Sequence, residues 1–201
     1  MDHRSPYNTL LIVISTIFVY VGCTANQERN FADSELLINK YDVPDDWKEV
    51  EHSNSYDFRE GEKSGSYIIF QYIKTPHLVR CGEDIYHYKT NRQAARNYQR
   101  LERYHYNDES FYRTTPWLIP EEFSFSSTTA EEWRFACAGS SFTLSPSEEN
   151  SVICTFLARY DEFIILFNIT IEMGGFDFSS IAQVEDVIRK MDQRMANHLE
   201  P

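Results

Sequence analysis

Apolar residues recur at helical intervals in two stretches of the chain, residues 91–105 and 181–199. Thr90 precedes the first stretch and Ser180 the second, and each is followed three positions later by glutamine, the spacing of a capping box. The second stretch carries one apolar stripe, formed by Ile181, Val184, Ile188, Met191, Met195 and Leu199. Charged residues lie opposite the stripe, namely Glu185, Arg189, Lys190 and Arg194. The pattern therefore predicts two amphipathic helices, each with one buried face.

Runs of β-branched and aromatic residues, bounded by turn residues, make up much of the remaining chain. The clearest runs cover residues 151–160 and 163–172, with Asp161-Glu162 between them as a tight turn. Further strands are predicted at residues 47–51, 65–74 and 131–138, whereas residues 78–88 are ambiguous, with a short strand as one interpretation. Strands that follow one another as hairpins, together with two amphipathic helices, predict an α+β fold in which the helices cover an antiparallel sheet.

The stretch between the first predicted helix and residue 131 has the composition of a loop. Residues 106–129 contain Pro116, Pro120 and many serines and threonines. Within this loop the short run Trp117-Leu118-Ile119 is apolar, and we expect it to tuck into the edge of the core.

The first two dozen residues carry a different kind of signal. Residues 9–21 are uncharged and mostly apolar, Arg4 precedes them, and Gly22-Cys23 follows. A basic start, a short apolar core and small residues are the layout of a secretory signal. The apolar run is shorter than the roughly 20 residues that a membrane-spanning helix needs.

Tyr20-Val21-Gly22-Cys23 resembles the lipobox of bacterial lipoproteins, in which a small residue precedes the cysteine that becomes the first residue of the mature chain. The resemblance implies a diacylglyceryl group on Cys23, acyl chains such as palmitate, and a body held on the extracytoplasmic face of the cell membrane. Tyr20 departs from the pattern, because an aliphatic residue is usual there. An uncleaved anchor helix is the second interpretation. A cytoplasmic protein is the last, because an exposed apolar run has no purpose there.

These features divide the chain into a signal peptide at residues 1–22, a lipidated tether at 23–33 and a single α+β domain at 34–201. The length after Cys23 suits one domain, and no internal repeat is present. The formal net charge is -12, and an acidic surface repels phosphate backbones. We therefore expect no nucleic-acid partner and no adhesion of the domain itself to anionic lipid headgroups.

Three cysteines remain if Cys23 is lipidated, which predicts one disulfide and one leftover thiol in an oxidising compartment. Cys137 and Cys154 lie on successive predicted strands, whose pairing can bring their Cα atoms within the about 7 Å that a disulfide requires. Such a bridge closes a loop of about sixteen residues and stabilises the fold by about 3 kcal/mol. The alternative is two reduced core cysteines, with Cys81 either free or bonded to one of them.

The layout of the body resembles a PsbP-like α/β/α sandwich: a Pro-Trp start, a strand, a helix, a run of hairpins and a terminal helix. The resemblance covers residues 36–199. Besides the layout, it rests on Pro44, Trp47, Ala94, Ala95, Cys137 and Cys154. It implies a binding or assembly role outside the cytoplasm more often than catalysis.

Motifs for catalysis and metal binding are absent from the sequence. It contains no C-x-x-C, no paired-histidine spacing, no Gly-rich phosphate loop and no Ser-x-Gly-type elbow. Adjacent glutamates such as Glu121-Glu122 would point to opposite faces of a strand and form no carboxylate dyad. We therefore expect no metal, no cofactor and no enzymatic activity. The alternative is an envelope or extracellular hydrolase with unidentified catalytic residues.

An aromatic patch is the most suggestive feature for recognition, and it comprises Tyr98, Tyr104, Tyr106, Tyr112 and Trp117. Aromatic side chains with polar tips bury area and still form hydrogen bonds, so they are enriched at binding surfaces. The hypothesis is a ligand-binding surface, and the alternative is a core edge beneath the long loop. The sequence as a whole favours a membrane-anchored, extracytoplasmic lipoprotein that acts as a non-catalytic binding or accessory module. Its ligand would be a protein or a small molecule.

Overall fold

The computed structural model describes residues 29–53, 62–72, 80–107, 115–140, 151–172 and 181–199. By its contacts the chain divides into two compact units, Met1–Asn30 and Phe31–Pro201, and the fold belongs to the second. The elements in chain order are the 3-10 helix η1 (Asp33–Glu35), β1 (Trp47–Ser53), β2 (Glu62–Tyr72), β3 (Arg80–Tyr88), α2 (Asn91–His105), β4 (Glu132–Ser140), β5 (Ser151–Tyr160), β6 (Phe163–Glu172) and α3 (Ile181–Leu199).

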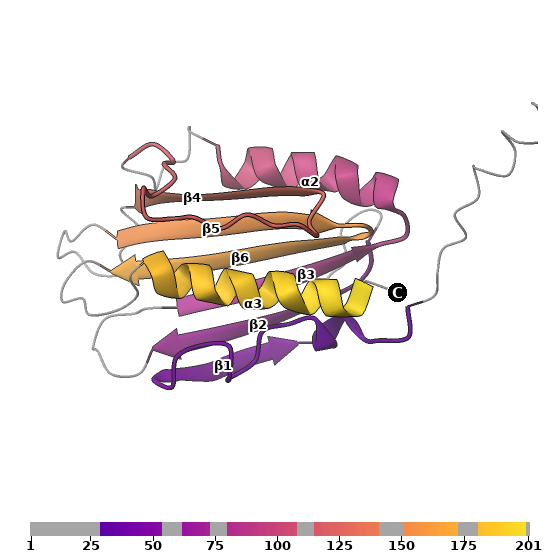
Figure 1. Ribbon diagram of the computed structural model, residues 1–201, viewed down its shortest axis with the longest axis horizontal. Coiled ribbons are helices and arrows are strands. Elements are labelled where there is room, and N and C mark those ends of the chain that lie inside the picture. The colour runs from indigo at the N-terminus through magenta and orange to yellow at the C-terminus, as the bar shows by residue number, and fades with distance from the viewer. Residues whose placement is uncertain are drawn as a thin grey trace, which may run out of the picture. The chain divides into compact units, whose positions relative to one another are not determined.

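The six strands form one sheet in the order β1-β2-β3-β6-β5-β4, and every neighbouring pair is antiparallel (Figure 1). The prediction of an α+β fold is therefore confirmed. The predicted tight turn is also present, because Asp161 and Glu162 alone connect β5 to β6. Asp161 has a φ of 50°, in the left-handed region that aspartate tolerates better than most residues.

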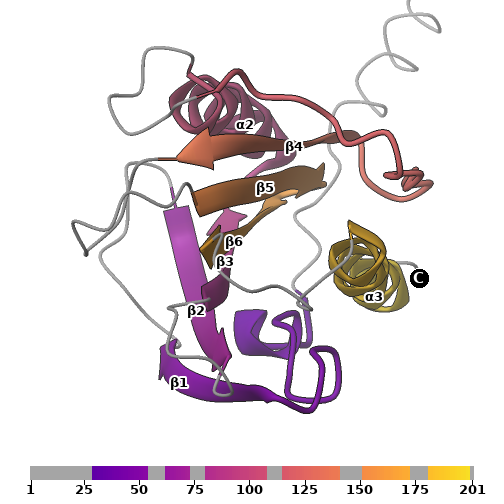
Figure 2. The same cartoon turned by 90° about the vertical axis from the view of Figure 1, so that its left-hand side faces the viewer.

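Helices lie on both faces of the sheet, with α2 against one face and α3 against the other (Figure 2). The alternation along β6 shows how one strand serves two cores. Phe163, Ile165, Phe167 and Ile169 belong to the core beneath α3, and Ile164 and Leu166 belong to the core beneath α2. A strand that is buried on both faces has a nearly continuous apolar sequence, which is why this strand was the clearest in the pattern.

Helix α2 begins and ends at the predicted residues. The hydroxyl oxygen of Thr90 accepts a hydrogen bond from the backbone N–H of Gln93 at 3.2 Å, which satisfies a free donor at the helix start. Ala94, Tyr98 and Leu101 form its buried face. The helix is thus fixed both by a local cap and by packing on the sheet.

Helix α3 confirms the predicted apolar stripe and corrects the predicted polar face. Val184, Ile188, Met191 and Met195 are buried, and Ile181 and Leu199 pack against the same core. Glu185, however, is also buried. Its carboxylate accepts hydrogen bonds from the backbone N–H of Ser124 (2.7 Å) and from the Ser124 hydroxyl (2.9 Å), which offset the cost of burying it. A loop segment therefore covers one flank of α3. The helical pattern of the sequence cannot predict this contact, because it involves residues far apart along the chain.

Residues 78–88, where a short strand was one interpretation, contain β3, a nine-residue strand between β2 and β6. A buried glutamate, Glu83, obscures its pattern. One further expectation is corrected. Leu118 and Ile119 do not tuck into the core, since they are 65% and 66% exposed. The main chain holds them instead, through hydrogen bonds that Leu118 exchanges with Cys137 at 2.8 and 2.9 Å.

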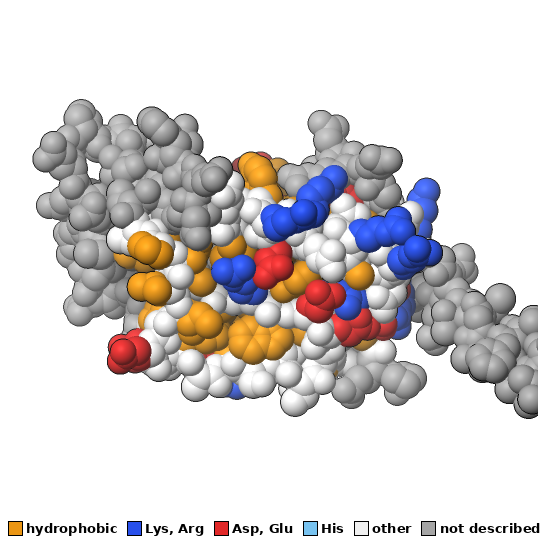
Figure 3. Space-filling view, turned by 90° about the horizontal axis from the view of Figure 1, so that it is seen from above, with side chains coloured by type: hydrophobic (Ala, Val, Ile, Leu, Met, Phe, Trp, Pro, Cys, Tyr) orange, Lys and Arg blue, Asp and Glu red, His pale blue; other side chains and the backbone are white. Residues whose placement is uncertain are grey.

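Charge is unevenly distributed over this acidic chain. Figure 3 looks onto the top of Figure 1, where α2 lies, and shows Lys and Arg side chains gathered along one side of that face. Helix α2 itself contains four arginines, Arg92, Arg96, Arg100 and Arg103, and a single acidic residue, Glu102. All four arginines are exposed.

Candidate binding pocket on the α3 face

Two segments flank helix α3 and hold it on the sheet. On one side, the hydroxyl of Ser127 donates to Asp192 at 2.5 Å, and Ser124 bonds Glu185. On the other side, Arg194 donates to the backbone oxygen of Leu37 at 2.5 Å and forms an ion pair with Asp42 at 2.5 Å. The second set of contacts fixes the chain that leads into β1, and this chain forms one wall of a pocket.

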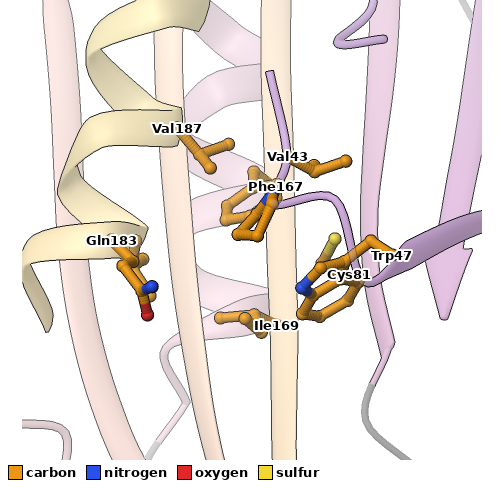
Figure 4. A pocket seen from close by; sticks show the side chains of 9 residues that line it. Val43, Trp47, Cys81, Phe167, Ile169, Gln183 and Val187 are labelled. Atoms are coloured by element: carbon orange, nitrogen blue, oxygen red, sulfur yellow. The ribbon is translucent and has the colours of Figure 1, made fainter. Parts of the chain in front are cut away.

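The pocket lies between the first turns of α3, the chain entering β1, and the paired residues Cys81 of β3 and Ile169 of β6 (Figure 4). Its lining consists of Val43, Pro44, Trp47, Cys81, Phe167, Ile169, Gln183, Val184 and Val187. Its cavity volume is ≈ 20 Å³, so it is a shallow recess that opens to solvent. Three lining residues have side chains that can form hydrogen bonds: Trp47, Cys81 and Gln183. Of these, Gln183 is exposed to solvent.

Local structure explains how these side chains meet. The backbone N–H of Trp47 donates to the carbonyl of Pro44 at 3.0 Å, which closes a turn just before β1. Figure 4 shows Val43 and Trp47, on either side of this turn, beside Phe167 and Cys81 of the sheet. Val184 and Val187 are three positions apart on α3 and so lie on one face of the helix. The result is an apolar recess with aromatic and aliphatic walls.

Cys81 contributes apolar surface to this recess. It is a free thiol and only 4% exposed. Burial raises its pKa well above the ordinary value, and the nearby carboxyl of Glu83 adds to the effect. Because the thiolate is the reactive form, this cysteine is expected to be inert and to pack as a small hydrophobe.

Glu83 is fully buried on the same face of β3, two residues beyond Cys81. Its Oε2 accepts a hydrogen bond from the backbone N–H of Ile38 at 2.5 Å, while Oε1 has no partner within the described residues. Burial raises its pKa to about 8, although the Ile38 N–H and the charge of Arg194 oppose the shift. At neutral pH the side chain is therefore mostly a neutral carboxylic acid.

A cluster of serine, histidine and aspartate tests the hydrolase alternative. Asp33 Oδ1 lies 3.0 Å from Nδ1 of His87, and the Ser64 hydroxyl lies 3.1 Å from that same nitrogen. A catalytic triad needs the serine on one ring nitrogen and the carboxylate on the other. Burial raises the pKa of Asp33, but the hydrogen bonds from His87 and Ser64 outweigh it and hold that pKa below its usual value. These three residues thus have the composition of a triad and the geometry of a structural hydrogen-bond network.

The predicted aromatic patch separates into residues with different surroundings. Tyr98 and Tyr106 are 3% and 6% exposed, and Trp117 packs on Tyr106 with ring centroids 5.1 Å apart. The Tyr106 hydroxyl lies 2.9 Å from the carbonyl oxygen of Arg134 and 2.8 Å from that of Thr155, and burial raises its pKa well above the usual value. Tyr104 is 72% exposed, and Tyr112 lies outside the described residues. The structure thus favours the core-edge alternative for Tyr98, Tyr106 and Trp117.

The predicted disulfide is present. Cys137 of β4 and Cys154 of β5 are directly opposite in the sheet register, with Cα atoms 4.0 Å apart and sulfurs bonded. Strand pairing supplies the required proximity, as the sequence suggested. The bridge links the edge strand β4 to the rest of the sheet.

The predicted lipidation site, Cys23, lies outside the described residues. Within the described ranges, no helix is both long enough and apolar enough to cross a bilayer. In that same part of the chain, no three His, Cys, Asp or Glu side chains gather into a set that could hold a metal ion.

Comparison with known proteins identifies a shared fold. The chain is similar to the extracellular domain of PknH from Mycobacterium tuberculosis, with a TM-score of 0.57, 9% identity, and coverage of 86% of this chain and 100% of that domain. A structure from Bacteroides thetaiotaomicron VPI-5482 matches with a TM-score of 0.32 and 14% identity, over 73% of this chain and 41% of that one. No family model matches, and no curated protein matches by sequence. At 9% identity the PknH similarity shows the fold alone, and the lipoprotein and PsbP-like resemblances stay predictions.

Sequence reasoning missed the pocket because its residues come from four separate segments. Four lining residues were singled out in the sequence, but for separate reasons: Pro44 and Trp47 as the Pro-Trp start, Cys81 as the leftover thiol and Val184 as part of an apolar stripe. Val43, Phe167 and Val187 look like ordinary core residues in the sequence, and no local motif connects them. Their proximity follows from strand order and from the docking of α3, which the pattern alone does not specify.

Proposed function

We propose that this chain is an extracytoplasmic, membrane-tethered binding module, without catalytic activity, whose α3-face pocket receives a small apolar group. The group would be an aliphatic chain or a compact ring, on a small molecule or as a side chain of a protein partner. The observation that carries the proposal is the apolar lining of the pocket. Small-molecule sites in proteins are concave and mostly apolar, with a few polar groups that fix orientation.

The site fits binding better than hydrolysis. A hydrolytic site gathers several titratable groups in a cleft, whereas Cys81 is the only titratable group in this lining, and burial keeps it protonated. Gln183 at the exposed end of the pocket supplies one hydrogen-bonding group for the polar end of a ligand. The arrangement therefore suits an amphipathic ligand with its apolar end inward.

The proposed location rests on two observations of different kinds. The N-terminal residues up to Cys23 have the layout of a lipoprotein signal, which would place acyl chains on that sulfur. The body shares its fold with the extracellular domain of PknH, which supports a location outside the cytoplasm. Mass spectrometry of protein purified from membranes tests the anchor directly, since acylation at Cys23 adds a defined mass.

A fluorescence titration tests the pocket. The compact unit Phe31–Pro201, which contains Trp47 in the pocket wall, is titrated with n-alkanols from propanol to octanol. We expect saturable quenching or enhancement, with affinity rising with chain length until the recess is full. Val187→Phe fills the recess and should weaken binding about tenfold or more.

Val50→Phe provides the matched control, because Val50 lies on β1 outside the lining and is 48% exposed. Thermal melts establish that both variants fold. Equal alkanol affinity in the Val187→Phe and Val50→Phe variants would contradict the proposed function, as would a linear, non-saturable response in the unmodified chain.

A further inference from the structure

The outer face of α2 is basic, although the protein as a whole is acidic. The helix carries four arginines and one glutamate, a formal charge of +3 with His105 neutral, within a chain of net charge -12. Its glutamate, Glu102, is already paired with Arg134 of β4 at 3.2 Å. Positive charge is thus concentrated on one element and is not neutralised within it.

Helical geometry places the four arginines in one line, here named the arginine stripe: Arg92, Arg96, Arg100 and Arg103. At about 100° per residue they fall within an arc of about 80°, roughly opposite the buried side of the helix. The stripe extends for about 16 Å at a rise of about 1.5 Å per residue. All four side chains are exposed, so the stripe forms a straight row of cations on the protein surface.

Apolar side chains lie at the C-terminal end of the stripe. Tyr104 borders it and is 72% exposed. Leu118 and Ile119, each about two-thirds exposed, follow Trp117, which packs on Tyr106 at the end of α2. A row of arginines beside exposed tyrosine and aliphatic side chains is the chemistry of a surface that contacts lipid headgroups.

We propose that the arginine stripe rests on a membrane whose outer headgroups are anionic, and that it orients the tethered body on that membrane. Guanidinium groups bind phosphate oxygens bidentately, and each cation near an anionic bilayer strengthens attachment. The net charge of -12 is the sum over the whole chain, and it does not describe the charge at the contact surface. Charges farther than about 10 Å from the contact are screened at physiological salt, so the positive charge of the arginine stripe determines whether this surface attracts anionic lipid.

The test uses the full chain reconstituted on vesicles, and it separates this inference from the proposed membrane tether on which it rests. Flotation with neutral phosphatidylcholine vesicles reports the tether alone. A nitroxide at Gln99→Cys, an exposed position on α2, then reports contact of the stripe. With one quarter phosphatidylglycerol, the accessibility of the label to a nickel chelate should fall about threefold or more, and high salt should restore it.

Two variants make the test specific. Arg96→Gln with Arg100→Gln should restore accessibility on anionic vesicles, because half of the stripe is gone. Lys48→Gln with Arg80→Gln removes the same charge from exposed residues of β1 and β3 and should leave the protection unchanged. Equal accessibility on both lipids, or protection that survives the stripe substitutions, overturns the proposal. Protection by soluble polyglutamate instead of anionic vesicles also overturns it, in favour of an acidic protein partner.

Discussion

The two faces of the sheet bury apolar side chains in different ways. Beneath α2 the buried tyrosine hydroxyl at Tyr106 has protein partners, and α2 packs directly on the strands. Beneath α3 the core contains a recess beside Cys81 and an ionisable side chain, Glu83, with one oxygen that lacks a partner in the described chain. Both features oppose stability. Both lie on the face that carries the proposed binding pocket.

The flanking segments sharpen this contrast. Helix α3 is held between chain segments through Arg194 with Asp42 and through Glu185 with Ser124, so its position depends on contacts that are distant in sequence. Helix α2 follows β3 directly and is fixed by the Thr90 cap and its own buried stripe. The position of α2 thus rests on local contacts, whereas that of α3 rests on contacts between residues far apart in sequence.

Removal of Tyr106 should have the largest effect on stability. Tyr106→Ala deletes a buried ring and the hydroxyl that lies between two backbone carbonyls, so we expect a loss of about 3–5 kcal/mol in the free energy of unfolding. Urea denaturation measures the loss. Alkanol affinity of the folded fraction should be unchanged, and a parallel loss of affinity would show that the two faces are not separate.

Loss of the disulfide should rank next. Cys137→Ala with Cys154→Ala removes the link between β4 and β5, whose half-cystines are 17 positions apart. We expect a loss of about 3 kcal/mol, because the unfolded chain regains the entropy of an open loop. Thermal melts of the variant and of reduced unmodified protein should agree. A reduced protein that is as stable as the oxidised one would contradict the assignment.

Glu83 should make stability depend on pH. Its pKa is about 8 in the folded chain against 4.5 for an ordinary glutamate, so between these values the folded state holds a proton that the unfolded state has lost. Stability therefore falls as pH rises through this window, by up to about 1.4 kcal/mol per pH unit. Glu83→Gln holds no such proton, so we expect its free energy of unfolding at pH 8 to exceed that of the unmodified protein by about 3 kcal/mol.

The same variant at pH 5 provides the control for that prediction. There the Glu83 carboxyl of the folded chain is protonated and neutral, so Glu83→Gln should match the unmodified protein within about 1 kcal/mol. Denaturation at the two pH values measures both differences. A variant that is destabilised to the same extent at pH 5 and pH 8 would mean that Glu83 is charged in the fold.

The smallest effect is expected at the cap of α2. Thr90→Ala removes the acceptor for the Gln93 N–H and should lower stability by about 1 kcal/mol. Thr90→Ser keeps the hydroxyl and is the matched control, so it should lie closer to the unmodified protein. If the alanine and serine variants have the same melting temperature, the side-chain cap contributes nothing measurable to stability.

Local patterns predicted the parts of this fold that depend on local physics. The ends of α2, β5 and β6, the turn at Asp161 and the pairing of Cys137 with Cys154 follow from periodicity, turn chemistry and strand succession. The course of the loop segments and the burial of Glu83 and Glu185 depend on contacts between residues far apart in sequence, and these contacts were not predicted. The pocket belongs to the second group, since it exists only where the chain near Val43 meets α3.

Methyl NMR of the compact unit Phe31–Pro201 during a titration with 1-hexanol tests the central claim most directly. The account predicts saturable shifts for methyl groups of the recess, those of Val43, Ile169, Val184 and Val187. Methyl groups beneath α2, those of Leu101, Leu157, Ile164 and Leu166, should stay in place. Shifts confined to the α2 core, or uniform shifts that never saturate, would contradict the assignment of binding to the α3 face.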